Sequence, residues 1–317
     1  MKRTITGIGE TVLDVIFRND VPQAAVPGGS TFNAMISLGR TAGVRFPDVA
    51  LRMLSEVGDD HVADIVVSFM KGNNVDPSLI TRRKGSQSHI SLAFLDSENN
   101  ASYEFYKDHA HTLLDPSSVK DTSFNRDDLV LFGSYFAVNP AIRENTRHLL
   151  ELAHRSGAIL YYDINFRKAH IGEIPVILPS IEENCRLSDF VRGSSEDFLY
   201  LWGTSDPEQV YREYISPLCP NFICTCGPEP LHIFSGNGMH LTFDVQKIQT
   251  VSTIGAGDNF NAGFLYGLLS RERAKEDCDK LSEDDWRDLV RVASRFSGNV
   301  CRSIYNYVEG GPEALGL

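Results

Sequence analysis

Hydrophobic residues recur along the chain either in short strand-like runs or at the spacing of helices, and the order of these two patterns predicts most of the elements. Short apolar runs typical of strands occupy residues 3–9, 49–57, 129–132, 158–163, 189–191, 222–225, 233–234 and 239–251. The i, i+3, i+4 spacing of helices marks residues 61–70, 140–154, 195–202, 207–215 and 283–302, and further helical patterns begin at Ala34 and Phe260. Because strands and helices alternate from residue 129 onward, we expect a mostly parallel sheet covered by helices.

The rhythm changes between residues 86 and 106. Two alternating runs, 88–95 and 102–106, flank a polar turn at 96–100, which is the pattern of a β-hairpin. Together with residues 12–20, this hairpin can form a small separate sheet that acts as a lid over a cleft. We therefore expect one domain over residues 1–317, with lid strands at about 12–20 and 87–107.

Composition narrows the class of protein. The chain has 317 residues, is 42% hydrophobic and carries a formal net charge of −12, which argues against nucleic acid as a partner. No apolar stretch approaches the ~18 residues that span a bilayer, and the N-terminus lacks a signal-peptide pattern. Six scattered cysteines show no disulfide or zinc spacing, so we expect reduced thiols and a cytoplasmic location.

The most informative stretch is 252–264, where small residues open a helical pattern. Gly255, Ala256 and Gly257 let several backbone amides point at one spot, which favours an anion. Asp258 follows in the first turn, where a carboxylate can accept a proton from a hydroxyl that attacks a phosphate. An Asp there is also an ordinary partner of the helix dipole, so the motif alone leaves both interpretations open.

The N-terminal part offers candidate contacts for a ligand. Gly28 and Gly29 precede a helix start and permit close approach to the backbone, and Asn33 can donate and accept hydrogen bonds. Asp14 interrupts an apolar run, either as a solvated strand residue or as a contact for sugar-type hydroxyls. Val12 stands where a dinucleotide fingerprint needs its third glycine, so that fingerprint fails.

Polar clusters follow three of the predicted strands, at 163–167, 192–197 and 225–227. Ligands of parallel sheets collect at the carboxyl ends of strands, so we expect these clusters to lie near one another. Arg167 is the cation of the first cluster and can hold a carboxylate or a phosphate.

This order of features resembles the ribokinase-like (PfkB) carbohydrate kinases, from Gly7 to about Tyr307. Residues 27–33 resemble the N-terminal glycine motif of that family, and residues 255–264 resemble its more specific C-terminal signature. Residues 57–60 and the Asp163-x-Asn165-x-Arg167 pattern match at the expected places. The resemblance implies a three-layer α/β/α fold with a small β lid that often serves in dimerisation.

The resemblance also implies roles for individual residues. Asp258 would be the catalytic base, and the amides of Gly255, Ala256 and Gly257 would form an anion hole. Asp14, Gly28, Gly29 and Asn33 would bind the hydroxyls of the substrate. ATP would lie across the end of the strand at 225–227 and the final helices. The residues expected on the nucleotide side are Ser194, Asp197, Thr225, Gly227 and Asn299. Mg²⁺ would be carried mainly by nucleotide phosphates and water.

Two departures from the family pattern stand out. Ser194 and Asp197 occupy the positions of the common Asn-x-x-Glu, and the shorter Asp or the adjacent Glu196 would reach Mg²⁺ only through water. Ser252 and Ile254 replace an Asp and a Thr that help to hold a monovalent cation, so we expect K⁺ to activate little.

The expected function is ATP-dependent phosphorylation of a primary hydroxyl of a small sugar, with a homodimer formed through the lid. The sequence resembles fructokinases and 2-keto-3-deoxygluconate kinases more than nucleoside kinases, and a neutral ketose is the favoured substrate. An acid sugar would need a cation such as Arg167 or Lys107. A nucleotide-linked oxidoreductase and a catalytically silent sugar or nucleotide sensor are the alternatives from other classes.

Overall fold

The computed structural model describes residues 3–95, 101–106, 114, 119 and 123–317. Its main sheet has nine strands in these residues, in the order β13-β12-β11-β10-β9-β8-β1-β4-β5. Pairing is parallel from β11 to β5 and antiparallel where β12 and β13 extend the edge. The strands are β1 (Thr4–Ile8), β4 (Ala50–Gly58), β5 (Ile80–Arg83), β8 (Leu129–Gly133), β9 (Ile159–Asp163), β10 (Phe190–Ser194), β11 (Phe222–Cys226), β12 (Glu229–Phe234) and β13 (His240–Phe243).

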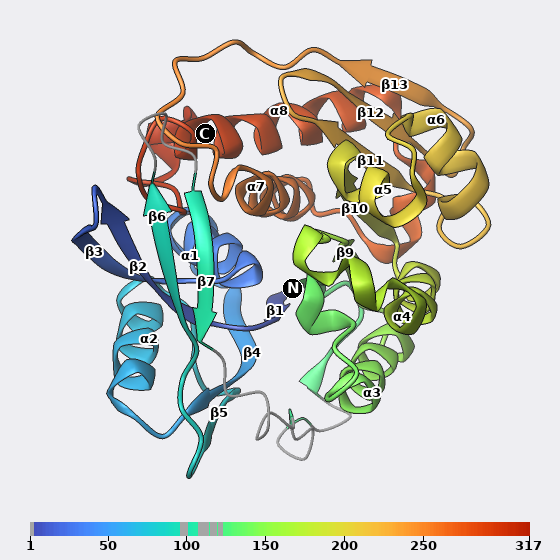
Figure 1. Ribbon diagram of the computed structural model, residues 1–317. Helices are drawn as coiled ribbons and strands as arrows, with labels where there is room; N and C mark the ends of the chain where they lie inside the picture. Colours follow the sequence, from blue (N-terminus) through green and yellow to red (C-terminus); the bar gives the residue numbers. More distant parts are fainter. Residues whose placement is uncertain (1–2, 96–100, 107–113, 115–118, 120–122) are drawn as a thin grey trace.

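Helices cover both faces of this sheet (Figure 1). Those with side chains in one apolar cluster are α1 (Ser30–Arg45), α2 (His61–Gly72), α7 (Ala256–Ser270) and α8 (Glu283–Val300). Those with side chains in the opposite cluster are α3 (Arg143–Arg155), α4 (Ile174–Leu187), α5 (Ser195–Trp202) and α6 (Pro207–Val210). The alternation of the two spacings in the sequence therefore predicted the layered fold correctly.

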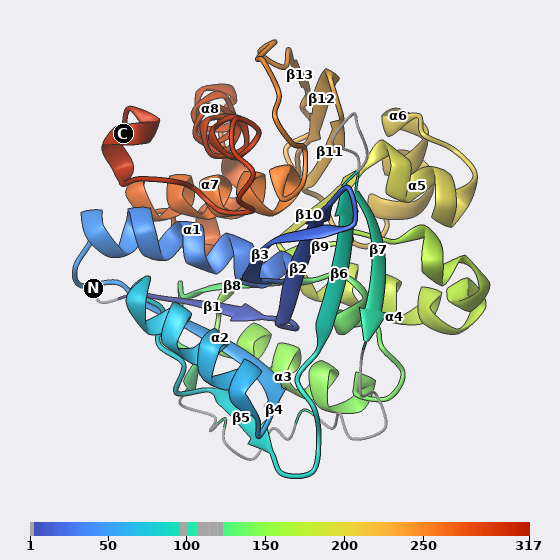
Figure 2. The same cartoon turned by 60° about the vertical axis from the view of Figure 1, so that its left-hand side comes forward.

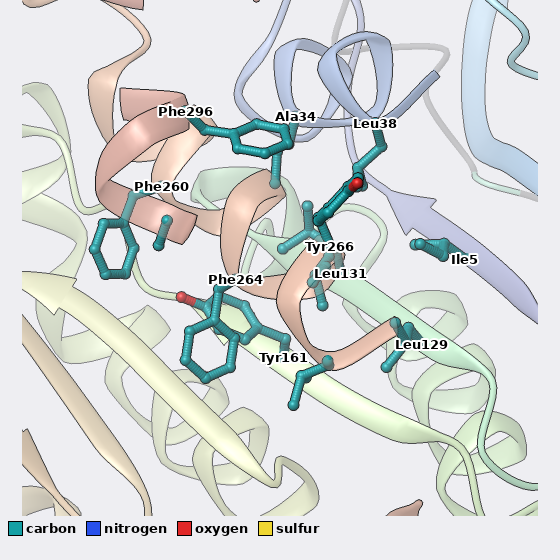
Figure 3. Close-up of a cluster of buried hydrophobic side chains, with 14 of the residues drawn as sticks. Ile5, Ala34, Leu38, Leu129, Leu131, Tyr161, Phe260, Phe264, Tyr266 and Phe296 are labelled. Atoms are coloured by element: carbon teal, nitrogen blue, oxygen red, sulfur yellow. The ribbon is translucent and has the colours of Figure 1, made fainter. Parts of the chain in front are cut away.

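Helix α7 is the centre of the first cluster. Phe260 and Phe264 lie four residues apart on one face of the helix and point at the sheet (Figure 3). The ring centroid of Phe264 lies 5.3 Å from that of Tyr161 on β9. This packing fixes the N-terminus of α7 near the carboxyl ends of the central strands.

A second, smaller sheet forms the predicted lid. Its order is β3-β2-β6-β7, from β2 (Val12–Arg18), β3 (Val21–Gly28), β6 (Ile90–Leu95) and β7 (Ala101–Tyr106). Each hairpin pairs antiparallel, and β2 joins β6 in parallel. Figure 2 shows this sheet beside the start of α1. The polar turn at 96–100 and Lys107 lie outside the described residues.

One expected strand was much shorter than predicted, and strands β3 and β5 and helix α4 were not predicted. The strand-like run at 239–251 is a strand only over His240–Phe243, and the chain continues without regular structure. The lid strand over 12–20 ends at Arg18, and Val21–Gly28 adds an unpredicted strand at the edge of the lid. Helix Ile174–Leu187 was not predicted either.

Among the described helices, none combines the length and apolar character that crossing a membrane requires.

Candidate active site

The site begins at the turn into α7. Gly255 has φ 76°, and a Cβ there would lie 2.9 Å from the carbonyl oxygen of Asn306, so glycine is needed at this position. In the described part of the chain, the amides of Gly255 and Gly257 have no acceptor, whereas the Ala256 amide donates to the Thr253 carbonyl at 3.2 Å. Two of the three expected anion-hole donors are therefore open.

Asp258 lies in the first turn of α7 and is buried. The Asn33 side-chain amide, from the first turn of α1, donates to Asp258 Oδ2 at 2.9 Å. Burial raises the pKa of Asp258, while the Asn33 hydrogen bond and the charge of Arg167 oppose that shift. Helices α1 and α7 lie side by side (Figure 2), so the two sequence motifs meet at one carboxylate.

Asp14 belongs to the same region. It is buried on β2, accepts a hydrogen bond from the Ser91 hydroxyl of β6, and lies so near Gly28 that a Cβ there would be 2.1 Å from its Oδ2. Burial raises the pKa of Asp14 to about 6, and the nearby charge of Asp258 adds to the rise. A solvated strand residue would not show this burial, so the ligand-contact interpretation gains support.

A cavity of about 270 Å³ opens between the lid and the loops around α7. Its polar lining includes Asp14 and Arg18 from β2, and Ser252 and Asn306 from the loops. This volume is near the lower end of the range for small-molecule sites, which suits a ligand of monosaccharide size.

The cluster after β9 contributes two further groups. Asn165 is buried with φ 39°, and its side-chain amide nitrogen has no partner in the described structure. Arg167 is exposed, yet its charge acts on Asp258. An unpaired buried amide costs free energy unless a ligand satisfies it, so this cluster has the character of a binding surface.

Beneath the α7 turn lies an ion pair to which the sequence analysis gave no role. Arg192, buried on β10, donates to Asp163 Oδ1 at 3.0 Å and to Thr225 Oγ1 at 2.7 Å. Its Nη1 would be 2.8 Å from a Cβ on Gly257. Burial acts to lower the pKa of Arg192, but Asp163, Tyr161 and Asp197 together outweigh it and hold the pKa above its ordinary value. The guanidinium is therefore a fixed positive charge beside the open amides.

Asn261 completes this network from α7. Its side-chain amide donates to Asp163 Oδ2 at 2.7 Å, and its Oδ1 accepts from the Tyr161 hydroxyl at 3.0 Å. The available signal for Arg192 was a charged residue directly after the apolar residues of a predicted strand. Asn261 gave no such signal, because a polar residue in the second turn of a helix is ordinary.

Two of the residues expected on the nucleotide side, Ser194 and Asp197, form a capping box at the start of α5. The Ser194 amide donates to Asp197 Oδ2 at 2.7 Å, and the Asp197 amide donates to Ser194 Oγ at 3.1 Å. Burial raises the pKa of Asp197 to about 6. Glu196 is exposed and accepts from the Tyr200 hydroxyl at 2.8 Å. Asp197 thus has a structural task already.

The other residues expected on the nucleotide side lie at the end of β11 and on α8. Gly227 follows β11 with φ 62°, and a Cβ there would meet open space. Asn299 lies half-buried on α8, where its Oδ1 accepts from the Glu309 amide at 3.3 Å. Ser252 Oγ accepts from the Ile254 amide at 3.1 Å. In the residues described, no group of three or more His, Cys, Asp or Glu side chains has a metal-holding arrangement.

Proteins similar to this chain occur among sugar kinases. A 5-dehydro-2-deoxygluconokinase of Geobacillus kaustophilus (strain HTA426) is 25% identical over 253 residues, which cover 77% of this chain and 72% of the relative. A fructokinase with bound ATP from Xylella fastidiosa has a TM-score of 0.84 at 20% identity, covering 99% of this chain and 97% of that one. A fructokinase from Vibrio cholerae O395, in a form with bound fructose, ADP and calcium ion, has a TM-score of 0.83 at 20% identity, covering 99% and 98%.

These structures confirm the expected ribokinase-like fold with its small lid sheet. A model of the family described as pfkB family carbohydrate kinase matches residues 8–306, which include both glycine motifs. That match covers nearly the whole chain. The chain therefore belongs to the pfkB family of carbohydrate kinases.

Proposed function

We propose that this chain transfers the terminal phosphoryl group of ATP to a primary hydroxyl of a small sugar, with Asp258 as the base. One observation carries the proposal: a buried carboxylate, held by Asn33, lies in the first turn of a helix whose opening amides at Gly255 and Gly257 are open. A base beside an anion cradle is the arrangement that phosphoryl transfer needs.

The residues divide the work as follows. Asn33 orients the Asp258 carboxylate, and the raised pKa of Asp258 makes it a stronger base toward a sugar hydroxyl. The Gly255 and Gly257 amides, together with the N-terminal end of the α7 dipole, stabilise negative charge on the group in transfer. Asp14 and the backbone at Gly28 and Gly29 bind the other hydroxyls of the sugar.

The nucleotide side rests on the family resemblance and on what fits here. ATP supplies the phosphoryl group, and the open space at Gly227 and the fixed charge of Arg192 suit its phosphate chain. Mg²⁺ would be held by phosphate oxygens and water, with Asp197 or Glu196 reaching it through water. Thr225, Ser194 and Asn299 stay predicted contacts, and little activation by K⁺ stays a prediction.

Fructose, a neutral ketose, is the first candidate substrate, since a protein of the same fold holds fructose with ADP. The second candidate is an acid sugar. The Geobacillus relative is named for one, and Arg167 places a positive charge near Asp258.

A coupled ADP-release assay over fructose, 5-dehydro-2-deoxygluconate and a nucleoside panel tests both candidates. Arg167→Gln should raise the KM of an acid sugar at least tenfold and leave that of fructose nearly unchanged. Its exposed neighbour Lys168 provides the control, as Lys168→Gln. Absence of ADP release with every acceptor would favour the silent-sensor alternative instead.

Asp258→Asn tests the proposed base directly. We expect kcat to fall by about 10²–10⁴, because the amide cannot take the proton, while nucleotide affinity stays close to that of the parent. Turnover measured by ADP release and binding measured by calorimetry check the two halves. Phosphorylation at the parental rate would exclude Asp258 as the base.

We propose a homodimer formed through the lid. Because side chains alternate along a strand, Val15 and Phe17 face away from the Asp14 side of the sheet. Phe17 and Phe94 stack with ring centroids 5.0 Å apart and are only partly buried. This half-exposed apolar surface suits a second copy of the lid.

Six unpaired cysteines support the proposed cytoplasmic location.

A further inference from the structure

Two thiols touch at the end of β11, on either side of Thr225. Cys224 Sγ and Cys226 Sγ are 3.8 Å apart. On a regular strand the side chains at i and i+2 share a face about 6.6 Å apart. Here the pairing of β11 with β12 is irregular between these two residues, and such an irregularity bends the strand. The bend explains why the sulfur atoms approach one another.

The two thiols differ in their surroundings. Cys224 is fully buried in the apolar cluster under α3, α4 and α5, whereas Cys226 is half-buried at its margin. The hydrogen bond between the thiols holds the pKa of Cys226 below its ordinary value and, together with burial, raises that of Cys224. Cys226 is thus the accessible nucleophile, and Cys224 is the sheltered partner in contact with it.

We propose that Cys224 and Cys226 form an oxidation site that closes to a disulfide with a small disulfide such as oxidised glutathione. The Cys226 thiolate attacks one glutathione sulfur, forming a mixed disulfide and releasing a glutathione thiolate. Cys224 Sγ then attacks Cys226 Sγ, releasing the second glutathione, and the Cys224 proton passes to a released thiolate. The protein loses two electrons and two protons, and one glutathione disulfide becomes two thiols.

Formation of the disulfide would alter the part of the site where we expect the phosphates of ATP to bind. The sulfur atoms must approach from 3.8 Å to about 2.05 Å, and Thr225 lies between the two residues. Thr225 Oγ1 accepts the 2.7 Å hydrogen bond from Arg192, whose guanidinium lies against Gly257. We expect the disulfide to move Thr225 and to weaken ATP binding several-fold, an effect that rests on the proposed function.

Thiol titration and peptide mass spectrometry test the chemistry without any assay of activity. After treatment with oxidised glutathione, the parent should lose two of its six thiols, with a cross-link between residues 224 and 226. Cys224→Ser should stop at glutathione on Cys226, and Cys226→Ser should stay unmodified at Cys224. Cys301→Ser, which keeps the pair, should oxidise as the parent does. A parent that keeps all six thiols, or a Cys226→Ser variant modified at Cys224, would overturn the proposal.

Calorimetric titration of ATP into the reduced, oxidised and re-reduced parent tests the consequence. The oxidised form should bind several-fold more weakly, and reduction should restore the affinity. Equal affinity in the reduced and oxidised forms would refute the link to the phosphate side. Failure of ATP to bind the reduced parent would count against the proposed function, whereas failure of the cross-link to form counts against the oxidation site alone.

Discussion

The buried side chain of Arg192 holds three strands and the turn that opens α7 in their relative positions. Its guanidinium connects β9, β10 and β11 through Asp163 and Thr225, and it lies under the turn that opens α7. Its Nε is buried without a partner in the described residues. A buried pair of this kind holds geometry more than it adds stability.

Arg192→Gln should lower the free energy of unfolding by about 3–5 kcal/mol, because it leaves the Asp163 carboxylate buried without its cation. Arg186→Gln is the matched control, since Arg186 pairs with Glu182 on the exposed face of α4 and such pairs contribute about 0.3–0.5 kcal/mol. Urea unfolding followed by circular dichroism measures both. Equal losses in the two variants would contradict the assignment.

Asp14 predicts a pH dependence of stability. Its pKa rises from 3.8 to about 6 on folding, so between these values the folded chain holds a proton that the unfolded chain has lost. Its contribution is therefore fully present below pH 3.8 and is lost as pH rises through about 6. Asp14→Asn removes that loss and should be more stabilising at pH 7 than at pH 4, by up to about 3 kcal/mol.

Urea unfolding of the parent and of Asp14→Asn at the two pH values checks this expectation. Asp48→Asn, at an exposed position, serves as the control for general effects of charge. A stability difference between parent and Asp14→Asn that does not grow with pH would refute the buried, raised-pKa picture.

The sequence pattern revealed the polar residues that follow a glycine motif or interrupt an apolar run, and it did not reveal those that meet only in space. Asp258, Asn33 and Asp14 follow recognisable local patterns, and the structure brings them together. The Arg192 and Asn261 contacts to Asp163 join three elements far apart in the chain. No local spacing reports such a meeting.

At the scale of elements, the contact between α7 and α8 positions the turn that opens α7. A Cβ on Gly263 would lie 2.6 Å from the Ala293 Cα, so the two helices touch backbone to backbone there. Gly298, on α8, has nothing within 4 Å of its Cβ position. The two glycines form a matched pair for a test.

Gly263→Ala should destabilise the protein by about 1–3 kcal/mol, because the added methyl group forces the helices apart. Gly298→Ala should instead stabilise it by about 0.5–1 kcal/mol, since alanine loses less backbone freedom in a helix. Thermal and urea unfolding compare the variants. Tolerance of Gly263→Ala without loss would show that α7 and α8 can slide past one another.

The elements that were missed have physical reasons. Pro22 and Pro27 argued against a strand at 21–28, yet the strand lies at the edge of the lid, where proline is tolerated. Pro175 and Pro179 similarly obscured α4, whose helix begins beside the first and includes the second. The run at 239–251 alternates like a strand, but no neighbouring strand pairs with residues 244–250 in the described structure.

At the scale of the whole molecule, we expect the lid sheet to form the interface of a homodimer. Phe94→Glu would place a charge on the half-exposed apolar face and should convert the proposed dimer to a monomer. Val176→Glu is the control, because Val176 is exposed on α4, which covers the main sheet and is not part of the lid. Light scattering over a range of concentrations measures the mass. A parent that is monomeric throughout, or dimers that persist in Phe94→Glu, would exclude dimerisation through this face.

The hydrogen bond between Asn33 and Asp258 joins residues that are 225 positions apart. A chain still emerging from the ribosome has its glycine-rich start long before it has the carboxylate that Asn33 must orient. Synthesis must therefore run almost to completion before the two groups can meet. With Asp258 as the proposed base, a copy that ends before residue 258 would consume no nucleotide, which ties turnover to most of the length of the polypeptide.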